Sequence, residues 1–114
     1  MKQLSRWLAA GLVLIVVTAP SLAFAGKGDP KAGKAVYDKK CAACHGKDGA
    51  GKTAIAKMLK VELRHLGSKE VQAKSDDGLR KESVEGVGKM KPVKGMSDED
   101  VANLVAYLRT LKEK

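Results

Sequence analysis

The chain has 114 residues, which is enough for one domain and too few for two ordinary ones. It contains 22 Lys and Arg against 13 Asp and Glu, so its formal net charge is +9, and such a surplus attracts anionic partners. Only 4% of the residues are aromatic, so little bulky apolar material is present for a core. These figures exclude a multidomain protein.

The N-terminal segment has the composition of a secretory signal. Lys2 and Arg6 make its start positive, residues 7–19 are uncharged and mostly apolar, and an A-x-A pattern ends at Ala25. The apolar run is shorter than the roughly 20 residues that a membrane span needs. The pattern predicts export with cleavage after Ala25 and a single mature domain over residues 26–114, with an uncleaved anchor as the alternative.

Without residues 1–25, the chain keeps 20 basic and all 13 acidic residues, a formal charge of +7. Its remaining aromatic residues are Tyr37 and Tyr107. A chain of this length buries only about 60–65% of its unfolded surface, so a bound cofactor would help to fill the core. Because an exported chain rarely meets nucleic acid, acidic proteins or anionic lipid headgroups are better candidates for its partners.

The mature chain begins with a helix expected over residues 27–40. Asp29 is its expected cap, and Pro30 suits a first helical turn. A glycine-rich loop is expected over residues 46–52. Residues 53–63 then have apolar side chains at helical spacing, which predicts a short helix or a wrapped loop.

Two further helices are expected in the second half. Ser75 is the expected cap of a helix that ends near Glu85, and residues 90–95 are expected to be extended or looped. Ser97 starts the clearest helix, with three acidic residues in its first turn as the helix dipole favours. The apolar face of that helix consists of Val101, Leu104, Val105, Leu108 and Leu111. No segment alternates like a strand, so the expected fold class is all-α.

Residues 41–45 read Cys-Ala-Ala-Cys-His, the C-x-x-C-H pattern of covalent haem attachment. Two thiols three residues apart can add to the two vinyl groups of one haem, and the following imidazole then lies under the iron. A disulfide across two residues would close a very short loop and gain little stability. The motif predicts one covalent haem c, with Cys41 and Cys44 as thioethers and His45 as proximal iron ligand, its second nitrogen held by a carbonyl.

Other interpretations of this region stand beside haem attachment. A thioredoxin-like dithiol pair belongs near a βαβ unit, and no strands are expected here. A zinc site would need His65 to complete the ligand set with the motif, and the motif could also be a coincidence. Residues 46–53 fit the P-loop pattern G-x-x-x-x-G-K-T, but a P-loop must follow a buried strand. The glycines are better explained as letting the backbone turn closely around a flat cofactor.

The C-x-x-C-H motif, a Met about halfway along the following chain and the strong last helix together resemble the small bacterial monohaem cytochromes c. The resemblance covers most of residues 26–114. It implies three to five helices wrapped around one haem, in a protein of the periplasm. It also implies that the first and last helices cross, at positions matched by Gly33, Tyr37, Val105, Tyr107 and Leu108.

The same resemblance nominates Met90 as distal iron ligand, because it lies in a loop between a glycine-rich stretch and the last helix. The family often has Pro directly after this Met, whereas here Lys91 intervenes. The family's proline after the haem motif, whose carbonyl holds the proximal His, is absent. Met96 and His65 are the alternative distal ligands, and Met58 is more simply a core residue.

With His45 and Met90 both on the iron, no coordination site is open, so the expected activity is single-electron transfer and not enzymatic catalysis. The expected form is a monomer without a stable membrane anchor after signal cleavage. Alternatives are a haem-based sensor or small-ligand binder with a labile distal ligand, and a dithiol oxidoreductase. Acidic redox partners are expected to be steered by lysines that flank the haem motif and the Met loop, namely Lys39, Lys40, Lys47, Lys52, Lys89, Lys91 and Lys94.

Overall fold

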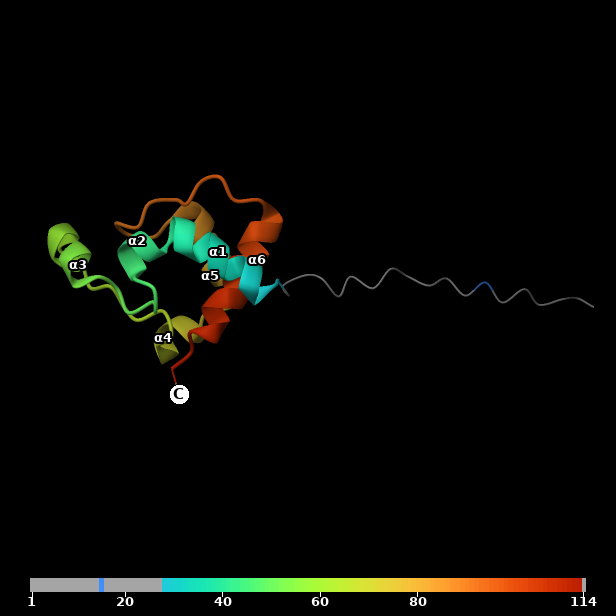
Figure 1. Cartoon of the computed structure of the whole chain (residues 1–114), viewed down its shortest axis with the longest axis horizontal. Helices are drawn as coiled ribbons and strands as arrows, with labels where there is room; N and C mark the ends of the chain where they lie inside the picture. Colours follow the sequence, from blue (N-terminus) through green and yellow to red (C-terminus); the bar gives the residue numbers. More distant parts are fainter. Residues whose placement is uncertain (1–14, 16–27, 114) are drawn as a thin grey trace, which may run out of the picture.

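Figure 1 shows the computed structural model, which describes Ile15 and residues 28–113. The expected signal, residues 1–25, lies outside the described residues apart from Ile15. Within residues 28–113 the β pairing is limited to one isolated bridge, so the all-α class is confirmed. No helix of this part has the length and apolarity that crossing a membrane requires. The helices are α1 (Pro30–Lys40), α2 (Ala42–His45), α3 (Thr53–Leu59), α4 (Lys69–Gln72), α5 (Asp76–Glu85) and α6 (Asp98–Thr110).

Local signals set where the longer helices begin. Asp29 caps α1, where its carboxylate accepts a hydrogen bond from the Lys31 N–H at 3.0 Å. Ser75 caps α5, where its hydroxyl accepts from the Gly78 N–H at 3.0 Å. Ser97 and Asp100 form a capping box at the start of α6. All three starts confirm the sequence predictions, because a cap involves only residues within three positions of it.

α1 and α6 lie side by side and form the main helix pair (Figure 1). They cross at Gly33, where a Cβ atom would come within 1.9 Å of the Asn103 carbonyl oxygen, so the crossing requires glycine. One turn further along α1, Tyr37 is fully buried against Leu104, and its ring centroid lies 5.1 Å from that of Tyr107. The expected crossing of the first and last helices is therefore confirmed.

A second apolar cluster joins α4, α5 and α6. Val71, Leu79 and Val105 are buried together, and Leu66 packs against them. The sequence pattern predicts no helix at the position of α4. This turn forms because the Ser68 hydroxyl accepts from the Val71 N–H at 3.4 Å and because Val71 enters the core. A single turn is too short to show helical periodicity in the sequence.

α3 lies apart from the α1–α6 pair (Figure 1) and makes no extensive contact with another described helix. Its Met58 side chain is 69% exposed, so the expectation that Met58 is a core residue is wrong. The cause is the position of α3, which offers this side chain no buried surface to pack against. The family resemblance implies three to five helices. Among the described residues, four helices have seven or more residues, and the other two, α2 and α4, are single turns of four residues.

Candidate haem site

Cys41 and Cys44 lie at the turn that joins α1 to α2. The backbone N–H groups of Cys44 and His45 donate to the Cys41 carbonyl at 3.2 and 3.0 Å. Both cysteines are free thiols. Cys41 is half-buried against the apolar cluster around Tyr37, and Cys44 is exposed. One helical turn therefore brings together the three residues of the predicted attachment motif.

The pKa of the Cys41 thiol is shifted in the direction opposite to that of an attacking thiol in a reactive dithiol pair. Burial raises the pKa of Cys41 to about 11, with the nearby Cys44 thiol as a second cause. An oxidoreductase of the dithiol type needs an attacking thiol whose pKa lies well below the ordinary value. The raised pKa therefore makes Cys41 a poor attacking thiol.

Hydrogen bonds fasten the segment that follows the motif. The Tyr37 hydroxyl donates to the Gly46 carbonyl at 2.5 Å. The N–H groups of Gly51 and Lys52 donate to the last two carbonyls of the motif, at 2.7 and 2.9 Å. The glycine-rich loop thus folds back onto the haem motif and follows helix α2, which differs from the strand and loop of a phosphate-binding P-loop.

His45 has a half-buried ring whose Nδ1 atom is fully buried and has no hydrogen-bond partner among the described residues. Burial lowers the pKa of this imidazole, which favours the neutral form that binds a metal. Among the described residues, the expected carbonyl partner of the second ring nitrogen is not found. The loop after the motif instead bonds to the motif through the N–H groups of Gly51 and Lys52. A half-buried imidazole with a lowered pKa next to two unbridged thiols is a donor set that fits a covalent haem.

Met90 lies in the loop between α5 and α6, residues 86–97. Its backbone N–H and C=O both bond to Val87, at 2.9 and 3.1 Å, which closes a tight turn. At Gly86, where φ is +79°, a Cβ atom would lie 2.4 Å from the Met90 carbonyl oxygen. Glycine is therefore required there, and the turn holds the backbone of the half-buried Met90 in one conformation.

The alternative distal ligands are engaged elsewhere. Met96 packs against the apolar cluster around Tyr37, as a core residue would. His65 accepts a hydrogen bond at Nδ1 from the Gly67 N–H at 2.9 Å, and its Nε2 lies 3.5 Å from a Glu113 carboxylate oxygen. These contacts favour Met90 as the distal ligand.

A zinc site is not assembled in the part of the chain that the structure describes. No three His, Cys, Asp or Glu side chains there converge as a bound metal ion would require. His65, which the zinc interpretation needs as fourth ligand, instead contacts Gly67 and Glu113.

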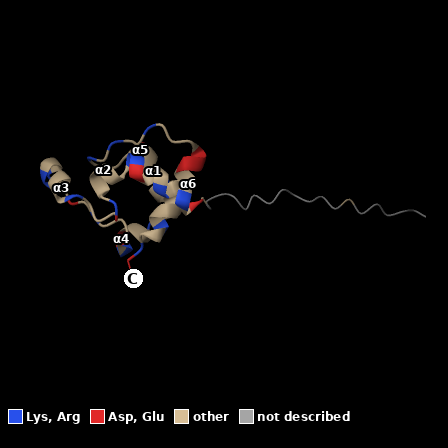
Figure 2. Cartoon of the chain, in the orientation of Figure 1, with Lys and Arg blue, Asp and Glu red and all other residues tan. Residues whose placement is uncertain are grey.

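The seven lysines that flank the motif and the Met loop are all exposed. Figure 2 shows basic residues along the loop before α6 and acidic residues at the start of α6. Two of the lysines also make internal hydrogen bonds: Lys40 Nζ donates to the Lys94 carbonyl at 3.0 Å, and Lys89 Nζ to the Leu59 carbonyl at 2.6 Å. These two contacts could not be predicted from the sequence, because each lysine lies far along the chain from its acceptor, 54 positions for Lys40 and 30 for Lys89.

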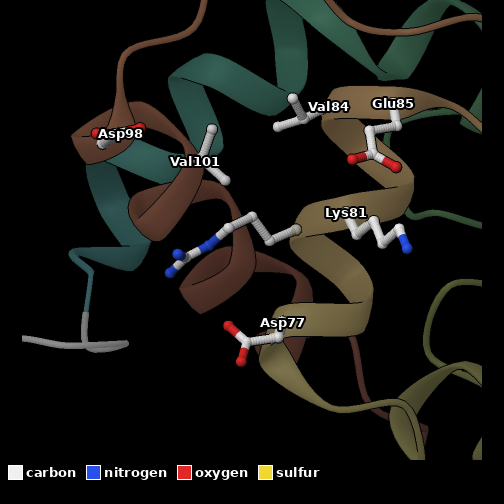
Figure 3. Close-up of a pocket in the computed structure, with 7 residues that line it drawn as sticks. Asp77, Lys81, Val84, Glu85, Asp98 and Val101 are labelled. Atoms are coloured by element: carbon white, nitrogen blue, oxygen red, sulfur yellow. The ribbon is translucent and has the colours of Figure 1, made fainter.

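A depression in the surface lies between α5 and the start of α6 (Figure 3). It shares no residue with the haem motif or with the loop of residues 86–97, so it is separate from the candidate haem site. Its lining is mostly charged and consists of Asp77, Arg80, Lys81, Val84, Glu85, Asp98 and Val101.

Residues 30–112 match the family model described as Cytochrome c. The chain is 38% identical over 90 residues to cytochrome c-554(547) of Halothiobacillus neapolitanus, which covers 75% of this chain and 99% of that protein. It is 34% identical over 115 residues to cytochrome c-555 of Chlorobaculum tepidum, which covers 92% and 95%. Among solved structures, the KustC0563 c-type cytochrome superposes with a TM-score of 0.62 at 30% identity, over 71% of this chain and 98% of that one.

Proposed function

Because the chain belongs to the cytochrome c family, whose members carry electrons on a covalently bound c-type haem, we propose that it is an exported single-electron carrier with His45 and Met90 as axial iron ligands. Cys41 and Cys44 form the two thioethers in this proposal. The observation that supports it best is the single turn at residues 41–45, which holds together two free thiols and a half-buried imidazole whose pKa is lowered by burial.

When bound, the haem supplies an iron that gains or loses one electron, and a thioether ligand favours its ferrous state. His45 from α2 and Met90 from the turn at residues 87–90 would be the two protein side chains that hold the iron, one at each of the positions that the haem ring leaves free. With both positions held by the protein, oxygen and small substrates have no open coordination site. For this reason we propose electron transfer alone and no enzymatic reaction.

The compartment in this proposal is the periplasm of a bacterium. Residues 1–25 have the charge and hydropathy pattern of a cleaved secretory signal. Covalent attachment suits an exported protein, since the haem cannot dissociate where no replacement is supplied. The partners are redox proteins with acidic docking surfaces, which the exposed lysines near both ligand segments would attract.

The absorption spectrum of the haem-loaded protein tests the distal ligand. Ferric haem with a Met ligand has a weak near-infrared band, and we expect Met90→Ala to abolish it because the thioether is removed. Met96→Leu is the matched control and should keep the band, since Met96 packs in the core and Leu preserves most of its volume. Survival of the band in Met90→Ala would assign the distal ligand to another residue.

Two further measurements separate the other function classes. Fast carbon monoxide binding by the ferrous protein at neutral pH would indicate a ligand binder with a labile sixth position. A colourless protein exported from cells with intact haem-attachment machinery would indicate a dithiol protein. We expect neither result, because Met90 is held by its turn and the Cys41 thiol has a raised pKa.

A further inference from the structure

The loop of residues 86–97 is fastened to the rest of the molecule by lysine side chains on both sides of Met90. We propose that Lys40 and Lys89 are positioning residues for Met90, and that their hydrogen bonds, here called the lysine straps, keep this loop closed over the haem site. The inference rests on the proposed function, in which Met90 binds the iron.

The first strap joins the loop to α3. Lys89 directly precedes Met90, and its Nζ donates to the carbonyl of Leu59 at 2.6 Å. Leu59 is the last residue of α3, where carbonyl groups have no partner within the helix. An ammonium group at this end also complements the negative end of the helix dipole. The strap therefore satisfies a carbonyl that α3 leaves open and holds the residue next to Met90.

The second strap joins the loop to the haem-attachment turn. Lys40 is the last residue of α1 and directly precedes Cys41. Its Nζ donates to the Lys94 carbonyl at 3.0 Å, beyond Met90 along the loop. A Cβ atom on Gly95 would lie 3.2 Å from the same Nζ, so the ammonium group packs closely against the loop.

The remaining hydrogen bonds of the loop lie within the loop itself or connect it to α5. Met90 bonds to Val87 within the turn, and the Val93 N–H donates to the Ser83 carbonyl of α5 at 3.0 Å. Among the described residues, the hydrogen bonds that connect this loop to α1 and α3 are the two straps. Opening of the loop on the side of the haem motif is therefore opposed by Lys40 and Lys89.

This assignment divides the seven lysines near the site into two groups. Lys40 and Lys89 hold the loop. The other five have no side-chain hydrogen bond to a described residue and are available to partner proteins: Lys39, Lys47, Lys52, Lys91 and Lys94.

Amide hydrogen exchange in the haem-loaded protein tests the straps. Lys40→Met and Lys89→Met each remove the ammonium donor and keep an unbranched side chain. We expect the Met90 and Val93 amides to exchange about threefold faster in each variant, a modest effect because both lysines are exposed. Lys91→Met and Lys94→Met remove the same charge from the same loop and should exchange at the wild-type rate.

Cyanide binding to the ferric protein provides the readout at the distal ligand, because cyanide enters only when Met90 leaves the iron. We expect about threefold faster binding in the two strap variants and the wild-type rate in Lys89→Arg, which keeps a donor. A merely structural contribution would speed exchange of the Leu104 amide in α6 equally, and that result would overturn the proposal.

Equal exchange rates in the strap and control variants would also overturn the proposed role of Lys40 and Lys89. This holds even if the near-infrared band depends on Met90 as expected. Independence of that band from Met90 would instead overturn the proposed ligand, and with it the positioning role of the straps. The spectrum therefore tests Met90 as the ligand, and the exchange rates test the straps, so failure of one proposal can be distinguished from failure of the other.

Discussion

Tyr37 connects three parts of the molecule through one side chain. Its ring is fully buried where α1 crosses α6, and its hydroxyl donates to the Gly46 carbonyl directly after His45. The resemblance to the small bacterial monohaem cytochromes c implied that Tyr37 packs at the helix crossing. The hydroxyl adds a second role, which is to hold the peptide that follows the proximal ligand.

Tyr37→Phe separates these two roles, because it keeps the ring and removes the hydroxyl. We expect the free energy of unfolding, measured in urea on the haem-loaded protein, to fall by about 1–2 kcal/mol, since the Gly46 carbonyl loses its donor. Tyr107→Phe is the matched control and should change stability by less than about 0.5 kcal/mol, because its hydroxyl has no hydrogen bond among the described residues. Equal effects of the two changes would contradict the role of the Tyr37 hydroxyl.

The same variant predicts a pH dependence. Burial is the main cause that raises the pKa of Tyr37 above its ordinary value of 10.0. A group whose pKa is raised by folding contributes stability below its unfolded pKa, and this contribution is lost as the pH rises towards the folded value. The stability difference between wild type and Tyr37→Phe should therefore be constant up to about pH 9 and narrow as the pH rises from about 10 to about 11. A constant difference over that range would contradict the shift.

At the scale of the elements, Arg109 of α6 holds the connection between α4 and α5. Its Nη1 donates to the Gln72 carbonyl at 2.8 Å, and its Nη2 donates to the Lys74 carbonyl and to Asp76 Oδ1, both at 2.7 Å. These carbonyls lie at the end of α4, where a helix has no internal donors for them. The guanidinium therefore orders a connection that its own sequence specifies weakly.

Removing this guanidinium should loosen the α4–α5 connection. We expect Arg109→Met to lower the free energy of unfolding by about 1–2 kcal/mol, a moderate value because Arg109 and Asp76 are partly exposed. Urea unfolding provides the measurement, and faster amide exchange over residues 69–76 would locate the effect. Arg64→Met removes an exposed arginine without described hydrogen bonds and should change stability by less than about 0.5 kcal/mol. Comparable losses in both variants would contradict the specific role of Arg109.

At the scale of the whole molecule, charge is distributed unevenly. Acidic residues gather in the first turn of α6, where they complement the helix dipole, and basic residues follow the loop before it (Figure 2). Under the proposals above, two of the lysines near the ligand segments serve as straps, and the lysines proposed to steer partners are the others, among them Lys91 and Lys94.

Electron transfer to an acidic redox protein tests this division of the lysines. We expect the bimolecular rate to fall as ionic strength rises, because salt screens the attraction. At low salt, Lys91→Gln and Lys94→Gln should each reduce the rate by about two- to threefold. Lys69→Gln on α4 removes an equal charge away from the ligand segments and should leave the rate nearly unchanged. A rate that does not respond to ionic strength would rule out steering by the lysines.

The helix starts at Asp29, Ser75 and Ser97 could be predicted because each depends on its own next few residues. The candidate haem-attachment residues at positions 41–45 could be nominated for the same reason, since five consecutive residues define the motif. α4 was missed because one turn has no periodicity, and the exposure of Met58 was missed because helical spacing does not say whether a partner surface exists.

By itself, the sequence determined the all-α class, which follows from local periodicity and caps, and the residues proposed for haem attachment, which form a contiguous motif. The crossing of the first and last helices was implied only by the resemblance to the small bacterial monohaem cytochromes c. Only the tertiary structure decided that His45 Nδ1 lacks a carbonyl partner among the described residues and that Lys40 and Lys89 bond to the backbone on either side of the Met90 loop. The physical reason is sequence distance. The two strap contacts join residues 54 and 30 positions apart, and only folding brings such partners within reach of a hydrogen bond.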